Sequence, residues 1–137
     1  MKTVEIMDNW KNKTILIVDD SALNRQILIE FFKIKNFNIT EAADGKEAIE
    51  KIISEKPDLI LLDLIMPVMD GFETMEYLLK EKISIPIIVI TAYIKDNTYK
   101  RCKDLGAAGF LNKPVKMHEL YNMISGILEN QPDEVNT

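Results

Sequence analysis

The chain has 137 residues, 47% of them hydrophobic, a length that suits one compact domain rather than two. Its 22 acidic residues outnumber its 17 basic ones, giving a net charge of −5, and no basic run stands out; this argues against general attraction to nucleic acid or anionic lipid. With one cysteine and no Cys/His cluster, we expect neither an internal disulfide nor a zinc site, and we expect a cytoplasmic protein whose partners are proteins.

The two ends of the sequence differ in character from the segment between them. The first residues mix charged and apolar positions and lack the apolar core of a signal peptide, and no later stretch is apolar for long enough to cross a bilayer. We therefore expect no membrane partner. We divide the chain into an N-terminal extension over residues 1–12, one domain over 13–130, and a flexible, polar C-terminal tail over 131–137.

Five short apolar runs alternate along the chain with five amphipathic stretches. The runs predict strands over residues 14–18, 38–42, 59–62, 85–90 and 109–111. The stretches carry apolar residues three or four positions apart and predict helices over residues 22–35, 46–55, 72–82, 97–105 and 117–129. Such alternation predicts a three-layer α/β domain, in which helices cover both faces of a parallel sheet.

The composition of the strands predicts their order in the sheet. The first, third and fourth strands are almost entirely apolar, as expected of central strands, whereas the second and fifth are mixed and suit the edges. This favours the order 2-1-3-4-5 of a doubly wound (βα)5 sheet. In this order the topological switch point lies between the first and third strands, and ligands of open α/β sheets bind in the crevice at such a point.

Three carboxylates follow directly on two of the central strands. Asp19 and Asp20 come after the first strand, and Asp63 comes after the third. Two unit charges about 4 Å apart repel by roughly 4 kcal/mol at an effective dielectric near 20, and burial adds to this cost. We therefore expect a cation between the three carboxylates.

A hydroxyl group and an ammonium group follow the last two strands. The fourth strand ends at Thr91 and Ala92, and the fifth ends close to Lys113 and Pro114. A carboxylate can accept a phosphoryl group when a divalent cation neutralises the incoming oxygens and fixed donors hold the rest. The residue types at this predicted edge of the sheet therefore suit phosphoryl transfer.

In these motifs the sequence resembles the receiver domain of two-component response regulators. The matching segments are Val18-Asp19-Asp20, residues 63–71, Thr91-Ala92 and Lys113-Pro114, and the resemblance covers about residues 13–129. All four segments occur in order, each at a predicted strand end. The resemblance implies a flavodoxin-like fold and a phosphorelay signalling domain that assists its own phosphorylation and dephosphorylation rather than an enzyme.

The resemblance assigns the metal site and the phosphoacceptor. It implies that Asp63 accepts the phosphoryl group and that Asp20 and Asp63 bind Mg²⁺ directly, with the backbone carbonyl of Ile65 as a third ligand and Asp19 acting through water. Oxygen ligands alone suit Mg²⁺, which usually keeps several waters, and Mn²⁺ is expected to substitute for it.

The resemblance also implies a switch. Lys113 would pair with Asp63 and then with a phosphoryl oxygen, while Thr91 would move to hydrogen-bond another oxygen, with space left by the small Ala92. Phe110 would rotate inward and change the packing of the face formed by the fourth helix, the fifth strand and the fifth helix. The bond between Lys113 and Pro114 is expected to be cis.

Two further features concern the surroundings of Asp63. Ile65 and Tyr93 flank the site, and their bulk would restrict the water that hydrolyses the acyl phosphate. Residues 66–71 are expected to form a turn that shapes the loop, with Gly71 free to adopt positive φ. We also expect Ser21 to cap the first helix and Asp44-Gly45 to form a turn.

The resemblance implies that a histidine kinase or a histidine phosphotransfer protein supplies the phosphoryl group. The protein would then change its contacts with a downstream protein or relay the group onward. We expect a single-domain regulator without DNA-binding output. The alternative is a receiver module excised from a hybrid sensor histidine kinase, since residues 21–25 resemble the start of the first helix in such receivers.

Two functions of other classes fit the sequence less well. A Mg²⁺-dependent aspartyl phosphatase of the haloacid dehalogenase type needs an acid two residues after its nucleophile, where this chain has Ile65. A flavin-binding module of the same topology needs a phosphate loop rich in Ser, Thr and Gly, whereas the acidic Asp19-Asp20 would repel phosphate.

Overall fold

The computed structural model describes residues 12–130. Residues 1–11 of the expected N-terminal extension, and the whole expected C-terminal tail, lie outside the described residues. In chain order the elements are β1 (Thr14–Val18), α2 (Ala22–Ile34), β2 (Asn38–Ala42), α3 (Gly45–Glu55), β3 (Leu59–Leu62), α4 (Gly71–Lys80), β4 (Ile87–Thr91), α5 (Thr98–Asp104), β5 (Gly109–Asn112) and α6 (Met117–Glu129).

The strands form one parallel sheet in the order β2-β1-β3-β4-β5, which confirms the predicted order. The register brings the strand ends close to one level. Val18 at the end of β1 lies opposite both Ala42 and Leu62, and Leu62 lies opposite Val89. Residues that follow these strands therefore meet at one edge of the sheet.

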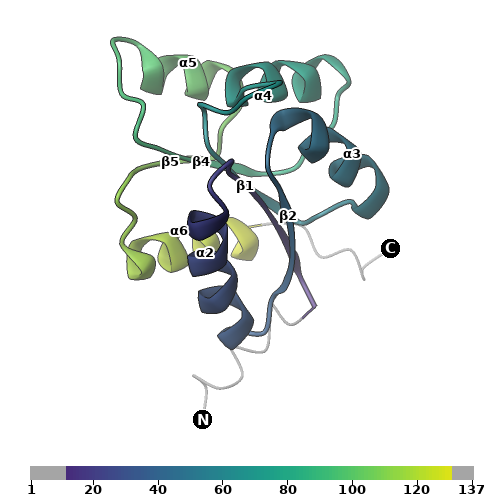
Figure 1. Ribbon diagram of the computed structural model, residues 1–137, viewed down its shortest axis with the longest axis vertical. Helices are drawn as coiled ribbons and strands as arrows, with labels where there is room; N and C mark the ends of the chain where they lie inside the picture. The colour runs from purple at the N-terminus through teal and green to yellow at the C-terminus, as the bar shows by residue number, and fades with distance from the viewer. Residues whose placement is uncertain (1–11, 131–137) are drawn as a thin grey trace.

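The helices form two layers, one on each face of the sheet (Figure 1). Side chains of a strand point alternately to opposite faces. In β1, Leu16 and Val18 pack in the core that the buried residues of α3, α4 and α5 complete, whereas Ile15 and Ile17 pack in the core shared with α2 and α6. The three-layer, doubly wound architecture predicted from the sequence is confirmed.

The helices next to the edge begin with side-chain caps. The Ser21 hydroxyl accepts a hydrogen bond of 3.2 Å from the backbone N–H of Asn24, as predicted. The expected turn at Asp44-Gly45 is instead the start of α3: Asp44 is its N-cap, and its carboxylate accepts from the N–H of Glu47 at 2.8 Å. A carboxylate at this position also interacts favourably with the helix dipole.

Element boundaries agree with the sequence-based prediction apart from a few residues at their ends. Two ends shift by two residues: α4 ends at Lys80 rather than at residue 82, and β4 begins at Ile87 rather than at residue 85 and extends to Thr91. The extension brings Thr91 into the sheet opposite Asn112, so that its side chain is held by a regular strand. No helix among residues 12–130 combines the length and the apolar character needed to cross a membrane.

Candidate functional site

The three carboxylates converge at the edge where β1 and β3 end. Asp19, Asp20 and Asp63 each offer an oxygen, and these oxygens lie within 4.8 Å of one another. Asp19 and Asp63 are buried, whereas Asp20 is exposed. Backbone hydrogen bonds fix the two buried residues, since the N–H of Asp19 donates to the carbonyl of Ala42 and that of Asp63 donates to the carbonyl of Val18.

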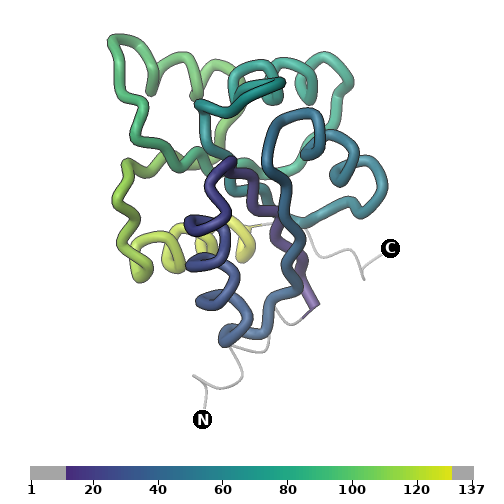
Figure 2. Tube along the Cα trace, in the orientation of Figure 1, coloured from purple at the N-terminus to yellow at the C-terminus, as the bar shows by residue number. Residues whose placement is uncertain are grey.

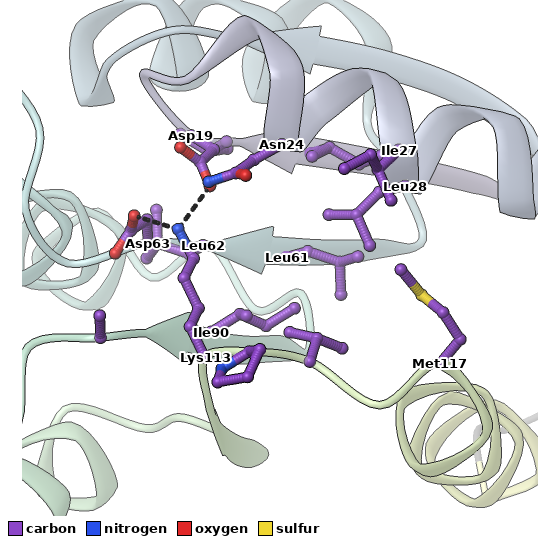
Figure 3. Close-up of a pocket in the computed structure, with 15 residues that line it drawn as sticks. Asp19, Asn24, Ile27, Leu28, Leu61, Leu62, Asp63, Ile90, Lys113 and Met117 are labelled. Carbon is purple, nitrogen blue, oxygen red and sulfur yellow. Dashed lines mark hydrogen bonds and ion pairs between the residues drawn. The ribbon is translucent and has the colours of Figure 1, made fainter.

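Lys113 reaches this cluster from the loop after β5. Its Nζ lies 2.8 Å from Asp63 Oδ2 and 2.8 Å from Asp19 Oδ2 (Figure 3). Partial burial alone would lower the pKa of Lys113, but its hydrogen bonds to Asp19 and Asp63 and the charges of both carboxylates outweigh this effect and raise the pKa above its usual value. Lys113 is therefore firmly charged at neutral pH.

The hydrogen bonds distinguish the three carboxylates. Asp19 is the most engaged: besides Lys113, it accepts from the N–H of Ser21 at 2.9 Å and from Asn24 Nδ2 at 3.4 Å. Asp63 accepts from the N–H of Leu64 at 2.7 Å as well as from Lys113. Asp20 is the exposed member of the group, although one of its carboxylate oxygens lies within 4.8 Å of those of Asp19 and Asp63.

The donor set of this site fits a hard divalent cation. Three carboxylates against one ammonium leave two formal negative charges, and every candidate ligand atom is oxygen. Mg²⁺ prefers oxygen ligands and retains waters, which the exposed side of the site at Asp20 would allow. The acidic cluster is thus suited to Mg²⁺.

The loop that follows Asp63 is packed tightly against its backbone. The N–H of Gly71 donates to the carbonyl of Leu64 at 2.8 Å, and a Cβ on Gly71 would collide with the carbonyl oxygen of Asp63. The expectation that Gly71 adopts positive φ is wrong, because positive φ in this loop occurs at Val68, with a value of 69°. A glycine is required at position 71 because the loop backbone lies so close to the backbone of Asp63. Ile65, between Asp63 and Gly71 in the sequence, has an exposed side chain.

Thr91 and its neighbours form the side of the site contributed by β4. The Thr91 side chain is buried, and its Oγ1 accepts a hydrogen bond of 3.0 Å from the N–H of Tyr93. The carbonyl of Thr91 accepts from the N–H of Lys113 at 3.0 Å, which ties β4 to the loop carrying the ammonium. Ala92 is exposed, and Tyr93 packs edge-on against Phe72 with ring centres 6.3 Å apart.

Phe110 lies one strand further from the carboxylates than Thr91. Its half-buried ring packs edge-on against the exposed Tyr99 of α5, with ring centres 5.6 Å apart. The peptide bond between Lys113 and Pro114 is cis, as predicted. The structure therefore brings the sequence-predicted residues to one edge of the sheet, with Phe110 on its flank.

Two residues near the site, Asn24 and Arg25, were not predicted from the sequence to be part of it. Arg25 Nη1 donates to the carbonyl of Asp19 at 2.6 Å, and its Nε donates to Glu41 at 2.7 Å. Asn24 contacts the Asp19 carboxylate directly. Their positions three and four residues after the helix cap place both side chains over the end of β1, and this spacing is the signal that could have identified them.

An apolar pocket of about 520 Å³ adjoins the carboxylates between α2 and α6 (Figure 3). Asp19, Asp63 and Lys113 form one end of it. The remainder is lined mainly by aliphatic side chains, among them Ile17, Ile27, Leu28, Leu61, Ile90 and Met117. The site is thus polar at the sheet edge and apolar beneath α2, which the sequence did not indicate.

Comparisons with known proteins agree with this geometry. The family model for the response regulator receiver domain matches residues 15–125, and the chain belongs to this family. Sporulation initiation phosphotransferase F of Bacillus subtilis is 34% identical over 117 residues, which cover 85% of this chain and 94% of that protein. A cyclic di-GMP phosphodiesterase of Thermotoga maritima is 34% identical over 118 residues, 86% of this chain but only 32% of that protein.

Several of the curated relatives are longer than this chain, which spans about half or less of the first ones that it matches. Among solved structures, the CheX-CheY-BeF3-Mg²⁺ complex from Borrelia burgdorferi contains a chain that matches with a TM-score of 0.82 and 31% identity, covering 88% of this chain and 92% of that one. The fold and the family are therefore settled by sequence and structure alike.

Proposed function

We propose that this receiver accepts a phosphoryl group on Asp63 from a phosphohistidine of a histidine kinase or a histidine phosphotransfer protein. The observation that carries the proposal is the position of Lys113 Nζ, 2.8 Å from both Asp19 and Asp63, within a cluster of three carboxylates. In this transfer a bond forms between an Asp63 oxygen and phosphorus, while the bond from phosphorus to the donor's imidazole nitrogen breaks and the histidine leaves with the electron pair.

The residues of the site would divide the work. Asp20, Asp63 and the backbone carbonyl of Ile65 would hold Mg²⁺, and Asp19 would act through water, consistent with the hydrogen bonds that already occupy its carboxylate. When bound, the cation would neutralise charge on the phosphoryl oxygens. Lys113 lies where it can hold one of these oxygens after transfer, since it already contacts Asp63.

Thr91 and Phe110 would carry the signal away from Asp63. Thr91 Oγ1 accepts from the N–H of Tyr93, so that its own hydroxyl proton remains available to a phosphoryl oxygen. Movement of Thr91 would open space for Phe110, whose ring supports Tyr99 on the surface of α5. Rotation of Phe110 would therefore change the face that α5, β5 and α6 present to a partner.

Relay of the phosphoryl group is an output that such a domain can perform by itself. The name of the Bacillus subtilis relative describes phosphoryl transfer, and the present chain matches 94% of that relative's length. Relay requires only that Asp63 be reachable by a second histidine, and the exposed Asp20 shows that this edge is open to solvent. We propose protein contacts and phosphoryl relay as the output of this chain.

The decisive experiment is intact-mass measurement after incubation with acetyl phosphate and Mg²⁺. The wild type is expected to gain one phosphoryl group, and Asp63→Asn is expected to gain none. Asp44→Asn is the matched control, because Asn also caps helices well and Asp44 lies at the start of α3 rather than in the acidic cluster. An unmodified wild type, or equal modification of Asp63→Asn, would contradict the proposal.

A further inference from the structure

Helix α2 exposes an apolar stripe along the side that faces α6. Leu23, Ile27, Phe31 and Ile34 lie four, four and three residues apart, which places them on one face of the helix. Leu23 is 70% exposed, Ile27 50% and Ile34 77%, and Phe31 is half-buried. Three of the nine large exposed hydrophobic residues among residues 12–130 thus belong to this single stripe.

The stripe continues onto α6 and into the apolar pocket. Ile27 and Met117 line the same pocket, and the rings of Phe31 and Tyr121 meet edge-on with centres 6.3 Å apart. Lys35 Nζ lies over the rings of Phe31 and Tyr121, 5.7 Å and 5.0 Å from their centres. Exposed apolar side chains that gather on one surface mark a site of interaction. We define the α2–α6 face as the surface formed by Met117 and Tyr121 of α6 together with the α2 residues Leu23, Ile27, Phe31 and Ile34.

The segment formed by residues 1–11 has the composition to cover this face. Its apolar residues Val4, Met7 and Trp10 recur at intervals of three, with Ile6 beside them, and charged or polar residues fill the positions between. A three-residue spacing would place these side chains on one side of a helical or polyproline II segment. Burial of these apolar side chains against another apolar surface would be favourable, because it removes them from water.

The segment also starts at the correct end of the face. The carbonyl of Asn12 accepts a hydrogen bond of 3.2 Å from Asn38 Nδ2, and Asn38 follows the end of α2 by only four residues. The beginning of the described chain and the end of α2 therefore lie at the same end of the molecule (Figure 2). Ile34, the most exposed residue of the stripe, lies at that end.

The length of the segment is sufficient in any backbone form. Eleven residues span about 36–40 Å when fully extended and about 16 Å as a helix. The stripe from Ile34 to Ile27 covers seven residues of α2, or about 10 Å. Trp10, two residues before Asn12, would meet the end of the face near Ile34, and the earlier apolar residues would reach toward Ile27.

We propose that residues 1–11 dock on the α2–α6 face through Trp10, Met7 and Val4. Docked there, the segment covers the apolar surface that leads from Ile34 to the pocket beside Asp63. The docking does not depend on the proposed function.

Trp10 is the only tryptophan of the chain, so that its fluorescence reports the docking directly. In the full-length protein without acetyl phosphate or Mg²⁺, we expect a blue-shifted emission maximum and weak quenching by acrylamide. Ile27→Gln and Ile34→Gln should both shift the emission toward that of free tryptophan and increase the quenching. Far-UV circular dichroism checks that each variant keeps its fold.

Ile53→Gln is the matched control, because Ile53 is a 54% exposed isoleucine on α3, on the opposite face of the sheet. The control should leave the Trp10 emission unchanged. A solvent-exposed Trp10 in the wild type, or a shielded Trp10 that neither α2 variant affects, would overturn the proposal. An emission maximum that shifts on dilution would also overturn it, because the face would then be covered by a second copy of the chain.

Discussion

Lys113 Nζ lies as close to Asp19 as a strong charge-assisted hydrogen bond allows, at 2.8 Å, although the two residues are 94 positions apart in the sequence. The contact spans the sheet from the end of β1 to the loop after β5. It gives the ammonium a second partner besides Asp63. If one of the two carboxylates released Lys113, the other would still hold it at the edge of the sheet.

The raised pKa of Lys113 predicts how its contribution to stability depends on pH. A lysine whose folded-state pKa exceeds its unfolded value of about 10.4 stabilises the fold fully below that value and loses the effect as pH rises through the folded pKa. At pH 7, Lys113→Met should lower the free energy of unfolding by about 1–2 kcal/mol, a modest value because solvent partly screens the ammonium.

Urea unfolding of wild type and Lys113→Met between pH 7 and pH 11 tests this expectation. The difference between the two proteins should shrink above the ordinary lysine pKa. Lys100→Met is the control, because Lys100 forms an exposed pair with Asp104 at 2.8 Å, which salt screens readily. A difference for Lys113→Met that is the same at both ends of the pH range would rule out the ion pairs as its source.

The positions of the site residues could be predicted from the sequence, but their contacts could not. Apolar strands followed by Asp19 and Asp63 indicate a common edge, since parallel strands that alternate with helices end together. The bridge from Lys113 to Asp19 depends on the register of four strands and on a side-chain rotamer. Neither quantity is encoded in local periodicity, because the residues of the central strands are almost all apolar whatever their partners.

Two other differences have similar physical causes. Glycine is compatible with both positive φ and close packing, and the sequence does not reveal which of the two Gly71 provides; only the position of the Asp63 carbonyl decides it. The apolar spacing of α2 predicted a helix correctly, but the helix carries apolar residues on more of its surface than the sheet covers. Which of them remain exposed, such as Ile34, depends on where α6 lies.

The close approach of Gly71 to Asp63 predicts that Gly71→Ala disturbs the site. The added Cβ would meet backbone atoms, the carbonyl oxygen of Asp63 and Leu64 Cα at 2.8 Å, which cannot rotate away as a side chain would. We expect a loss of about 1–3 kcal/mol in the free energy of unfolding and slower modification by acetyl phosphate.

Gly126→Ala provides the matched comparison for Gly71→Ala. Gly126 lies within α6, and a Cβ added there meets no atom within 4 Å. Because alanine favours the helix, this variant should be more stable than the wild type by about 0.5–1 kcal/mol. Equal effects of the two substitutions in thermal unfolding would show that the contact with Asp63 has no importance.

Ile65 and Tyr93 are expected to set the lifetime of the phosphorylated state. Ile65 is 51% exposed two residues after Asp63, and half-buried Tyr93 occupies the corresponding position after Thr91. Bulk at both positions would hinder the water that attacks the acyl phosphate, so Ile65→Asn and Tyr93→Ala should each accelerate dephosphorylation. Loss of phosphoryl group over time, followed by intact mass, measures this rate; Ile53→Asn on α3 should leave it unchanged, and unchanged rates in both site variants would contradict the expectation.

Arg101 is expected to hold α5 against α4, and the adjacent Cys102 offers a means of measuring it. Arg101 Cζ lies 3.9 Å from the centre of the Phe72 ring, and Nη2 lies 3.4 Å from Glu76. Cys102 is 1% exposed, and burial, opposed in part by Arg101, raises the pKa of its thiol. Reaction of the thiol with a disulfide reagent therefore requires local opening of α5.

Replacement of Arg101 by Gln removes a cation–π contact of about 0.5–1 kcal/mol and should raise the labelling rate of Cys102 about two- to fivefold. Lys103→Gln, an exposed change on the same helix, should leave the rate within error of the wild type. Equal rates for Arg101→Gln and the wild type would show that α5 is held by its buried residues alone. A faster rate would instead show that the contact between Arg101 and Phe72, in the first turn of α4, restrains α5. That turn begins against the backbone of Asp63, and α5 carries Tyr99, which packs on Phe110.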